Sequence, residues 1–324
     1  MDTPQNIVLS IVVVNFETPD YTMQCLESIY KNPPSCGFEV IVMDNGSRDG
    51  SLEMIRQTFP RVTAIETGAN LGFARANNLG MNNARGGYIL LLNSDTKILD
   101  NSLDRMLEYL MARPEMGAVG PRQLDGSGKL QLSWGAFPTF FSEIYRKVMH
   151  HRLSINDLKI RDYLEEKYQG SSDVDWVSGS CLMARKRALL DAGLLDGHFF
   201  MYFEDIDLCH SIRACGWKVH YCSDITIIHY GGVSAKKNIL HVLVEYRRSQ
   251  LYFTRKHYGL KGVLLLKALL FVKYSFSFLR WGIIFITDKL HRRDALQSFS
   301  GLLLSKKTIE LVFSYGSPSS ELGL

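Results

Sequence analysis

The chain has 324 residues, of which 46% are hydrophobic and 22% are charged, and its formal net charge at pH 7 is +4. This composition excludes a disordered acidic or basic protein, because such chains lack the apolar surface that offsets the entropy of ordering. The length predicts one large domain or two ordinary ones. The six cysteines form no C-x-x-C pair and fit no zinc-site spacing, so we expect buried, reduced thiols.

The charge is distributed unevenly. From Gly231 to the end the chain carries 15 Lys and Arg against 5 Asp and Glu, whereas the preceding part carries 22 against 28. A basic tail on an acidic body is typical of proteins that meet nucleic acid or anionic membranes. Aromatic residues within the apolar runs of this tail favour lipid, so we expect no nucleic-acid partner. The first residues lack the positive region of a secretory signal, and we expect the catalytic part to face the cytoplasm.

The first half alternates strand-like and helix-like segments. Apolar, β-branched runs predict strands at 7–14, 38–43, 62–66 and 88–92, and amphipathic patterns predict helices at 19–30, 51–57, 73–83 and 103–112. Four rounds of strand then helix indicate a Rossmann-like α/β fold with an open, mostly parallel sheet. Such sheets bind their ligands at the carboxyl ends of the strands.

The second half is less regular. Residues 137–172 are mixed and polar, and we expect a flap there rather than regular structure. Regular structure is predicted again at 174–185, followed by a helix at 205–215 and strands at 218–221 and 225–229. After Gly231 and Gly232 the pattern is helical, so we predict a catalytic domain over 1–232 and a basic, aromatic helical tail over 233–324.

The tail does not predict a simple membrane span. Lys267, Lys273 and Arg280 divide residues 262–287 into uncharged runs of five, five, six and seven residues. A spanning helix needs about 20 consecutive apolar residues. We therefore expect helices that lie in the headgroup region of a membrane. Packing of these helices against the body of the protein is the alternative.

Polar residues follow the predicted strands. Asp44 follows the second strand, and an Asp there can accept hydrogen bonds from a nucleobase or a ribose, although Asp-Asn-Gly-Ser also favours a turn. Asp95 follows the fourth strand, and hard carboxylate oxygens suit Mg²⁺ or Mn²⁺ on a diphosphate. His229 ends the last strand, where it is a candidate metal ligand.

An acidic cluster follows the aromatic stretch 199–203. Glu204, Asp205 and Asp207 would not share one face of a helix, so we expect them to have different roles. A partly desolvated carboxylate can act as a general base. The alternative is the ordinary preference for acidic residues in the first turn of a helix. The chain has no G-x-G-x-x-G, no P-loop and no G-x-S-x-G motif, which disfavours a dehydrogenase, a P-loop ATPase and a serine hydrolase.

Taken in order, these segments resemble family-2 glycosyltransferases with the GT-A fold, and most of all their bacterial rhamnosyltransferase branch. The resemblance covers residues 7–232, and it rests on His229 and on the strings at 13–16, 42–51, 70–80, 91–95, 176–180 and 200–209. Two positions depart from the family pattern. Asn77 stands where many relatives carry Arg, and Asn93 replaces the first Asp of a D-x-D metal motif.

The resemblance implies roles for individual residues. It implies Asp205 as the catalytic base, and Asp95 and His229 as ligands of a divalent cation, Mg²⁺ or Mn²⁺. It also implies that the nucleotide-sugar is bound by Asn15, Glu17, Asp44, Asn77 and Asn93, and that the sugar or acceptor pocket is bordered by Trp176, Gly179 and Glu204.

The function that the resemblance implies is inverting transfer of a sugar. We expect L-rhamnose from dTDP-rhamnose as the sugar and a lipid-linked cell-surface glycan as the acceptor, at the cytoplasmic face of the membrane with the protein bound peripherally. A UDP-hexose or UDP-N-acetylhexosamine donor is the alternative. A nucleotidyltransferase and an inactive membrane-bound scaffold are more remote alternatives; the first lacks a basic Gly-rich loop near the first strand.

Overall fold

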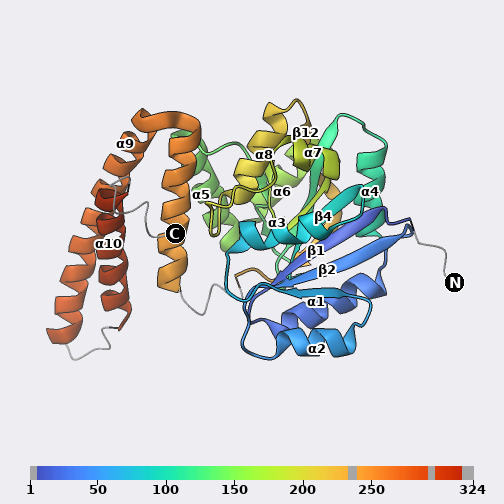
Figure 1. The fold of residues 1–324 in the computed structure, drawn as a ribbon. Helices are drawn as coiled ribbons and strands as arrows, with labels where there is room; N and C mark the ends of the chain where they lie inside the picture. The colour runs from blue at the N-terminus through green and yellow to red at the C-terminus, as the bar shows by residue number, and fades with distance from the viewer. Residues whose placement is uncertain (1–5, 233–238, 291–295, 316–324) are drawn as a thin grey trace. The chain divides into compact units, whose positions relative to one another are not determined.

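The computed structural model describes residues 6–232, 239–290 and 296–315. The chain divides into two compact units (Figure 1). The first unit contains the described residues up to Phe200 and from Glu204 to 232. The second contains the segment Met201–Phe203 and the two C-terminal helices.

The first unit begins with the predicted alternation of strands and helices. β1 lies between β2 and β4 and is parallel to both, and β3 is parallel to β2. The carboxyl ends of β1, β2 and β4 therefore meet at one edge of the sheet, as expected for this fold class. The elements are β1 (Leu9–Asn15), α1 (Pro19–Lys31), β2 (Phe38–Asp44), α2 (Ser51–Thr58), β3 (Thr63–Glu66), α3 (Phe73–Asn83), β4 (Tyr88–Asn93), β5 (Thr96–Lys97) and α4 (Ser102–Met111).

The sheet continues through strands of mixed direction. β11 (Cys181–Arg185) is antiparallel to β4 and to β6 (Met116–Leu124). The sequence pattern did not predict the strand β6. β12 (Lys218–His229) is parallel to β6 and antiparallel to β5. The two strands predicted for this region form one strand, because a register shift between Cys222 and Thr226 absorbs the break. The shorter elements are β7 (Leu130–Gln131), β8 (Trp134–Gly135), β9 (Ser171–Asp173), β10 (Trp176–Val177), α7 (Lys186–Asp191) and α8 (Glu204–Ala214).

The expectation of an irregular flap over residues 137–172 was wrong. This segment forms two helices, α5 (Phe140–Ser154) and α6 (Leu158–Lys167). A capping box between Thr139 and Ser142 begins α5, and the Asp157 carboxylate accepts from the backbone N–H of Ile160 at the start of α6. Local capping of this kind stabilises helices whose sequence shows little amphipathic pattern.

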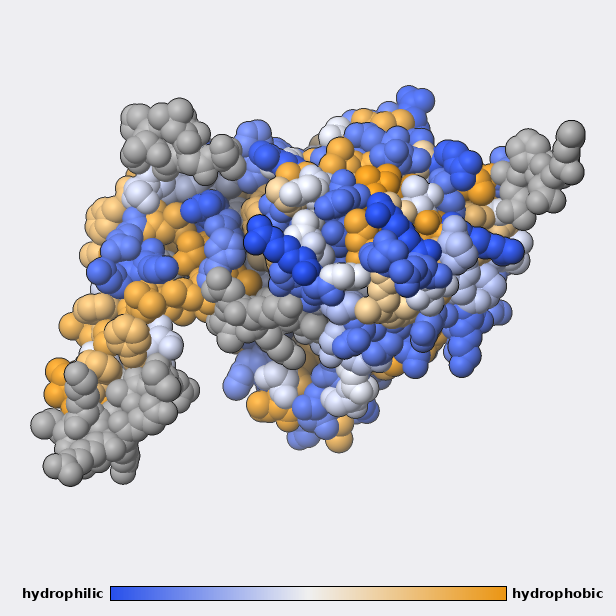
Figure 2. Space-filling view, turned by 60° about the horizontal axis from the view of Figure 1, so that its bottom comes forward, coloured by the Kyte–Doolittle hydropathy of each residue, from blue (hydrophilic) through white to orange (hydrophobic). Residues whose placement is uncertain are grey.

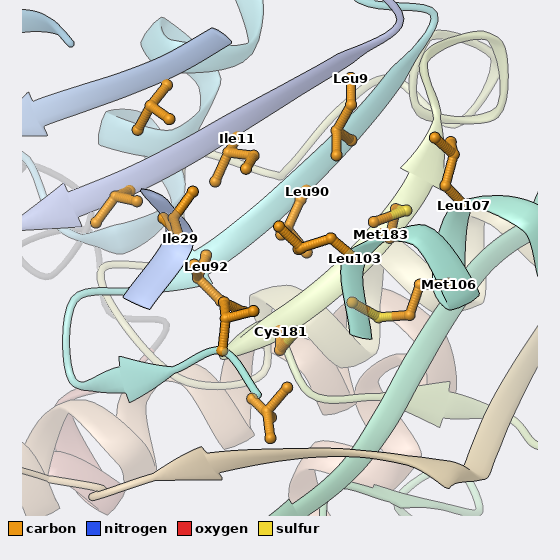
Figure 3. Packing of buried hydrophobic residues seen from close by; sticks show 14 of the residues in the cluster. Leu9, Ile11, Ile29, Leu90, Leu92, Leu103, Met106, Leu107, Cys181 and Met183 are labelled. Carbon is orange, nitrogen blue, oxygen red and sulfur yellow. The ribbon is translucent and has the colours of Figure 1, made fainter. Parts of the chain in front are cut away.

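The main core of the first unit lies between the sheet and the helices α1 and α4. Figure 3 shows side chains from three neighbouring strands pointing at these helices. Cysteines 25, 181, 209 and 222 are buried free thiols, as expected, whereas Cys215 is exposed. The labelled residues come from β1 (Leu9, Ile11), β4 (Leu90, Leu92), β11 (Cys181, Met183), α1 (Ile29) and α4 (Leu103, Met106, Leu107).

Helix α3 covers the opposite face of the sheet, and a glycine sets its distance from β1. A Cβ atom at Gly80 would lie 2.4 Å from Val12 Cγ1 and 3.2 Å from Met43 Cγ. The helix can approach this closely only because the glycine carries no side chain. This contact places the amino end of α3 beside the carboxyl ends of β1 and β2.

The second unit is helical. Helix α9 (Ile239–Leu290) is interrupted at Gly259, which has a φ of 67°, and α10 (Leu296–Ser314) packs along it through Leu270, Tyr274 and Val312. The segment Met201–Phe203 packs on α9, where the Phe203 ring lies 5.3 Å from the ring of Tyr246. By length and composition, Leu240–Thr287 is apolar enough to cross a membrane, despite the charges that break its longest apolar runs.

The contact at Gly80 leads to a prediction about stability. Gly80→Ala adds a methyl group that must displace Val12, so we expect it to destabilise the protein by about 1–3 kcal/mol, even though alanine is the better helix former. Thermal unfolding measures this change. Gly87→Ala is the matched control, since a Cβ there has open space. An equal or higher melting temperature for Gly80→Ala would contradict the close contact.

Candidate active site

The end of β1 is tied to the end of β2. Asn15 is fully buried, and its Nδ2 donates to Asp44 Oδ1 at 2.7 Å. Asn15 Oδ1 accepts from the Thr22 hydroxyl at 2.7 Å, and the second carboxylate oxygen of Asp44 accepts from the Ser47 N–H at 3.1 Å. Both ends of the Asn15 amide are therefore used, and this side chain fixes the orientation of the Asp44 carboxylate.

Glu17 lies in the loop after β1 with a left-handed backbone, φ 48°. Its N–H donates to Ser47 Oγ at 3.0 Å, and the same oxygen accepts from Asn15 Nδ2 at 3.1 Å. Ser47 thus links the loops after β1 and β2, a connection that we did not predict from the sequence.

Asn77 does not reach an accessible surface in this structure. It is 1% exposed, its Nδ2 donates to the Phe73 carbonyl at 3.0 Å, and its Oδ1 has no hydrogen-bond partner among the described residues. The loop before α3 is held by hydrogen bonds with Asn45, a residue that we did not predict to belong to the site. Asn45 Nδ2 donates to Asn70 Oδ1 at 3.0 Å, and Asn45 Oδ1 accepts from the Leu71 N–H at 2.9 Å.

The pairing of β5 with β12 brings together residues that are far apart in the sequence. His229 pairs with Thr96 in this ladder, and His229 Nε2 lies 3.3 Å from Asp95 Oδ1 and 3.4 Å from Asn93 Nδ2. The Tyr230 N–H donates to the Asp95 carbonyl at 2.9 Å. The structure therefore brings together Asn93, Asp95 and His229 beyond the end of β4.

Gln131, on β7, fixes the imidazole of His229. Its Nε2 donates to the His229 carbonyl at 2.8 Å, and its Oε1 lies 3.0 Å from His229 Nδ1. Because the first bond requires the amide nitrogen to face the carbonyl, the amide oxygen faces Nδ1, and the proton is assigned to Nδ1. Nε2 then carries a lone pair toward Asp95. No motif in the sequence marks Gln131.

This arrangement fits a divalent cation. A metal-binding histidine usually donates its other ring N–H to an oxygen acceptor, which here is Gln131 Oε1. The Asp95 carboxylate supplies a hard oxygen ligand. No cluster of three or more His, Cys, Asp or Glu side chains suited to a metal occurs in the ranges 6–232, 239–290 and 296–315. Two protein ligands suit Mg²⁺ or Mn²⁺ when a substrate diphosphate and water complete the coordination.

Asp205 lies at the start of α8 beside the turn at residues 178–180. Its Oδ2 accepts from the Gly179 N–H at 2.9 Å, and its Oδ1 accepts from the Ile206 N–H at 2.9 Å. Burial raises the pKa of the Asp205 carboxyl, and these N–H groups partly offset the rise. A Cβ at Gly179 would lie 3.2 Å from Asp205 Cβ, so a glycine permits this approach. A carboxylate with a raised pKa is a better proton acceptor.

Glu204 and Trp176 are largely buried in this structure, as are Asn15 and Asp44. Glu204 is 6% exposed, its Oε2 has no hydrogen-bond partner in the described part of the chain, and burial together with the charge of Asp205 raises its pKa well above the usual value. Trp176 is 6% exposed, and its indole N–H donates to the Ala136 carbonyl at 3.0 Å. Asp207 is buried as well, so of the three acidic residues Asp205 is the most accessible.

The raised pKa of Glu204 predicts how stability depends on pH. In the unfolded chain the Glu204 carboxyl loses its proton at a pKa of about 4.3. In the folded protein the same carboxyl keeps its proton to a higher pH. Wild-type stability therefore falls as pH rises through that window. Relative to wild type, Glu204→Gln should gain stability from pH 4 to pH 8 in denaturant unfolding, and Glu166→Gln on the surface should not. A constant difference across this range would contradict the assignment.

Comparisons with known proteins give the family and the fold. The family model described as glycosyl transferase family 2 matches residues 10–190. The mannosyltransferase PcManGT from Pyrobaculum calidifontis, solved with GDP-Man and Mn²⁺, is similar in structure with a TM-score of 0.53 and 16% sequence identity. The match covers 98% of this chain and 81% of that one, and it shows the shared GT-A fold.

Two curated relatives are similar in sequence. The N-acetylglucosaminyl-diphospho-decaprenol L-rhamnosyltransferase of Mycobacterium tuberculosis is 28% identical over 293 residues, covering 83% of this chain and 94% of the relative. Rhamnosyltransferase WbbL of Escherichia coli is 28% identical over 229 residues, covering 68% and 82%. Because the family model matches more than half of the chain and includes the ends of β1, β2 and β4, the protein belongs to glycosyl transferase family 2.

Proposed function

We propose that the protein is an inverting, metal-dependent glycosyltransferase that moves L-rhamnose from dTDP-rhamnose to a lipid-linked glycan. One observation carries this proposal: the turn at 178–180 contacts both halves of the site. The Ser180 carbonyl accepts from the Asn93 N–H at 2.9 Å, and the Gly179 N–H donates to Asp205 at 2.9 Å. The names of the two rhamnosyltransferase relatives support the donor and the class of acceptor.

In this proposal Asp205 is the general base. It removes the proton from an acceptor hydroxyl while that oxygen attacks the anomeric carbon. The bond from the anomeric carbon to the diphosphate oxygen breaks at the same time, the electron pair leaves with the nucleoside diphosphate, and the proton remains on Asp205. One displacement from the opposite face inverts the configuration. A divalent cation bound by Asp95 and His229 would stabilise the charge that develops on the leaving diphosphate.

The nucleoside would lie over the ends of β1 and β2. The Asp44 carboxylate, held by Asn15 and by the Ser47 N–H, would accept hydrogen bonds from the base or the ribose. Asn93 lies between this region and His229 and would contact the donor. Asp44 and Asn93 would contact the nucleoside of a UDP-hexose or a UDP-N-acetylhexosamine in the same way. The panel of donors described below distinguishes these sugars from rhamnose.

The helical unit would hold the enzyme at the cytoplasmic membrane surface, where a lipid-linked acceptor is accessible. Apolar side chains are exposed on this unit, as Figure 2 shows, and they include Leu264, Leu265, Val272, Phe276 and Ile283. Lysine and arginine near an anionic surface each contribute about 1 kcal/mol of attraction. Because Lys261, Lys273 and Arg280 are exposed between the apolar residues, we propose peripheral binding in the headgroup region.

The role of Asp205 is tested by turnover across a panel of donors. With Mg²⁺ or Mn²⁺, we expect the purified protein to release dTDP from dTDP-rhamnose, and not UDP from UDP-glucose, UDP-galactose or UDP-N-acetylglucosamine, in the presence of a lipid-linked acceptor. Asp205→Asn should lose about 10²–10⁴-fold in turnover and keep its affinity for the donor. Asp162→Asn, on an exposed part of α6, is the matched control.

Each outcome of this panel has a definite meaning. Release of UDP would keep the fold and the base and would overturn rhamnose as the sugar. Normal turnover by Asp205→Asn would remove this residue from the mechanism. Failure of the wild-type protein to bind any nucleotide-sugar would favour the inactive scaffold, and consumption of a nucleoside triphosphate would favour a nucleotidyltransferase.

Gln131 provides a test of the metal site that does not depend on turnover. Gln131→Leu removes both hydrogen bonds that orient His229, and loss of such a supporting residue typically lowers metal affinity by about 10–100-fold. We expect this decrease when free Mn²⁺ is titrated by electron paramagnetic resonance with dTDP present. Gln57→Leu, on the surface of α2, should bind Mn²⁺ like the wild type. Equal affinity in both variants would contradict a role for His229 as a ligand.

A further inference from the structure

A pocket of about 440 Å³ adjoins the proposed metal site. Its volume lies in the range of small-molecule sites. It extends from His229 and Gln131 past Ser178 to the helix α5, which contributes His150. The residues over the ends of β1 and β2 do not line it, so the pocket lies away from the region proposed for the nucleoside.

The wall of this pocket contains a buried donor with no acceptor. Gln123 is 1% exposed, and its Oε1 accepts from the Ser180 hydroxyl at 2.8 Å. The Gln123 Nε2, in contrast, has no hydrogen-bond partner within the described residues. An unsatisfied buried donor of this kind is costly, and its cost is recovered when a ligand supplies an acceptor oxygen.

The other polar groups define the chemistry of the ligand. Ser133 and Ser178 contribute hydroxyl oxygens; the Ser133 hydroxyl donates to the Pro121 carbonyl at 3.2 Å, and Ser178 Oγ lies 3.0 Å from Ser180 Oγ. Lys129 and His150 contribute nitrogen donors. The wall contains one carboxylate, Asp125, whose Oδ1 accepts from the N–H groups of Ser127 and Lys129 and from the Ser127 hydroxyl. The pocket therefore offers mainly donors and hydroxyls, which suits a ring rich in hydroxyl or amide oxygens that is linked to a phosphate.

The pocket lies next to the residues proposed to act in the reaction. Ser178 precedes Gly179, whose N–H donates to Asp205, and His229, the proposed metal ligand, also lines the pocket. A ring in this pocket would present a hydroxyl to Asp205 and to the anomeric carbon of the donor, on the side of that carbon opposite the leaving diphosphate. We propose that the pocket lined by Gln123, Ser178 and His229 binds the sugar ring of the acceptor, with Lys129 and His150 near its phosphate. This inference rests on the proposed function and names the acceptor site of that reaction.

The test separates acceptor binding from donor binding. Gln123→Glu keeps the shape and the Oε1 acceptor of the residue but replaces the free donor, and Gln123→Met removes both groups. We expect each variant of the full-length protein to bind N-acetylglucosaminyl diphosphate on a short prenyl chain about tenfold more weakly, as measured by calorimetric titration. The affinity for dTDP should be unchanged, which also shows that the variants are folded.

Gln169 provides a matched control. It lines a second pocket, of about 470 Å³, together with Arg122 and Glu165, and Gln169→Met should bind the acceptor like the wild type. Unchanged acceptor binding in both Gln123 variants would overturn the assignment, as would weaker binding in Gln169→Met alone. These measurements report acceptor binding without turnover, so they test the role of the pocket even if the wild-type protein does not use dTDP-rhamnose. Failure to use dTDP-rhamnose would count against the proposed function and not against the pocket.

Discussion

The site depends on the turn at residues 178–180. This turn leads into β11, and because β11 is antiparallel to β4, it lies beside the carboxyl end of β4. Backbone groups of the turn hold Asn93 on one side and Asp205 on the other. A Cβ at Gly179 would come within 3.2 Å of Asp205 Cβ, so the distance between the base and the strand ends is set by backbone contacts that a larger residue would disturb.

Desolvation gives the two neighbouring acidic residues different properties. Glu204 has one carboxylate oxygen without a partner in the described chain, and burial raises its pKa well above the usual value. Asp205 accepts two backbone N–H bonds, which favour its charged form and oppose the effect of burial. Burial therefore favours the protonated form of Glu204, whereas the backbone donors at Asp205 favour its charged form, which is the form that accepts a proton.

Local patterns in the sequence predicted the first half of the fold, because β1, β2 and β4 are mostly apolar runs that end in polar residues. The strand β6 was missed because Gly117, Gly120 and Pro121 interrupt its apolar pattern, and the helices α5 and α6 were missed because their stability comes from caps rather than from periodicity. Residue type also cannot show burial, as Asn77 and Trp176 illustrate. Gln131 and Gln123 were not predicted, since their significance arises from contacts with His229 and Ser180, 98 and 57 residues away.

The most direct test of the account is the anomeric configuration of the product. A single displacement assisted by Asp205 requires the new glycosidic bond to have the configuration opposite to that of the sugar in the nucleotide donor. Nuclear magnetic resonance of the purified product, recorded before any chemical anomerisation, measures it through the one-bond coupling between the anomeric carbon and its proton. We expect inversion. Retention would contradict it, because retention requires a second displacement or a different face of attack.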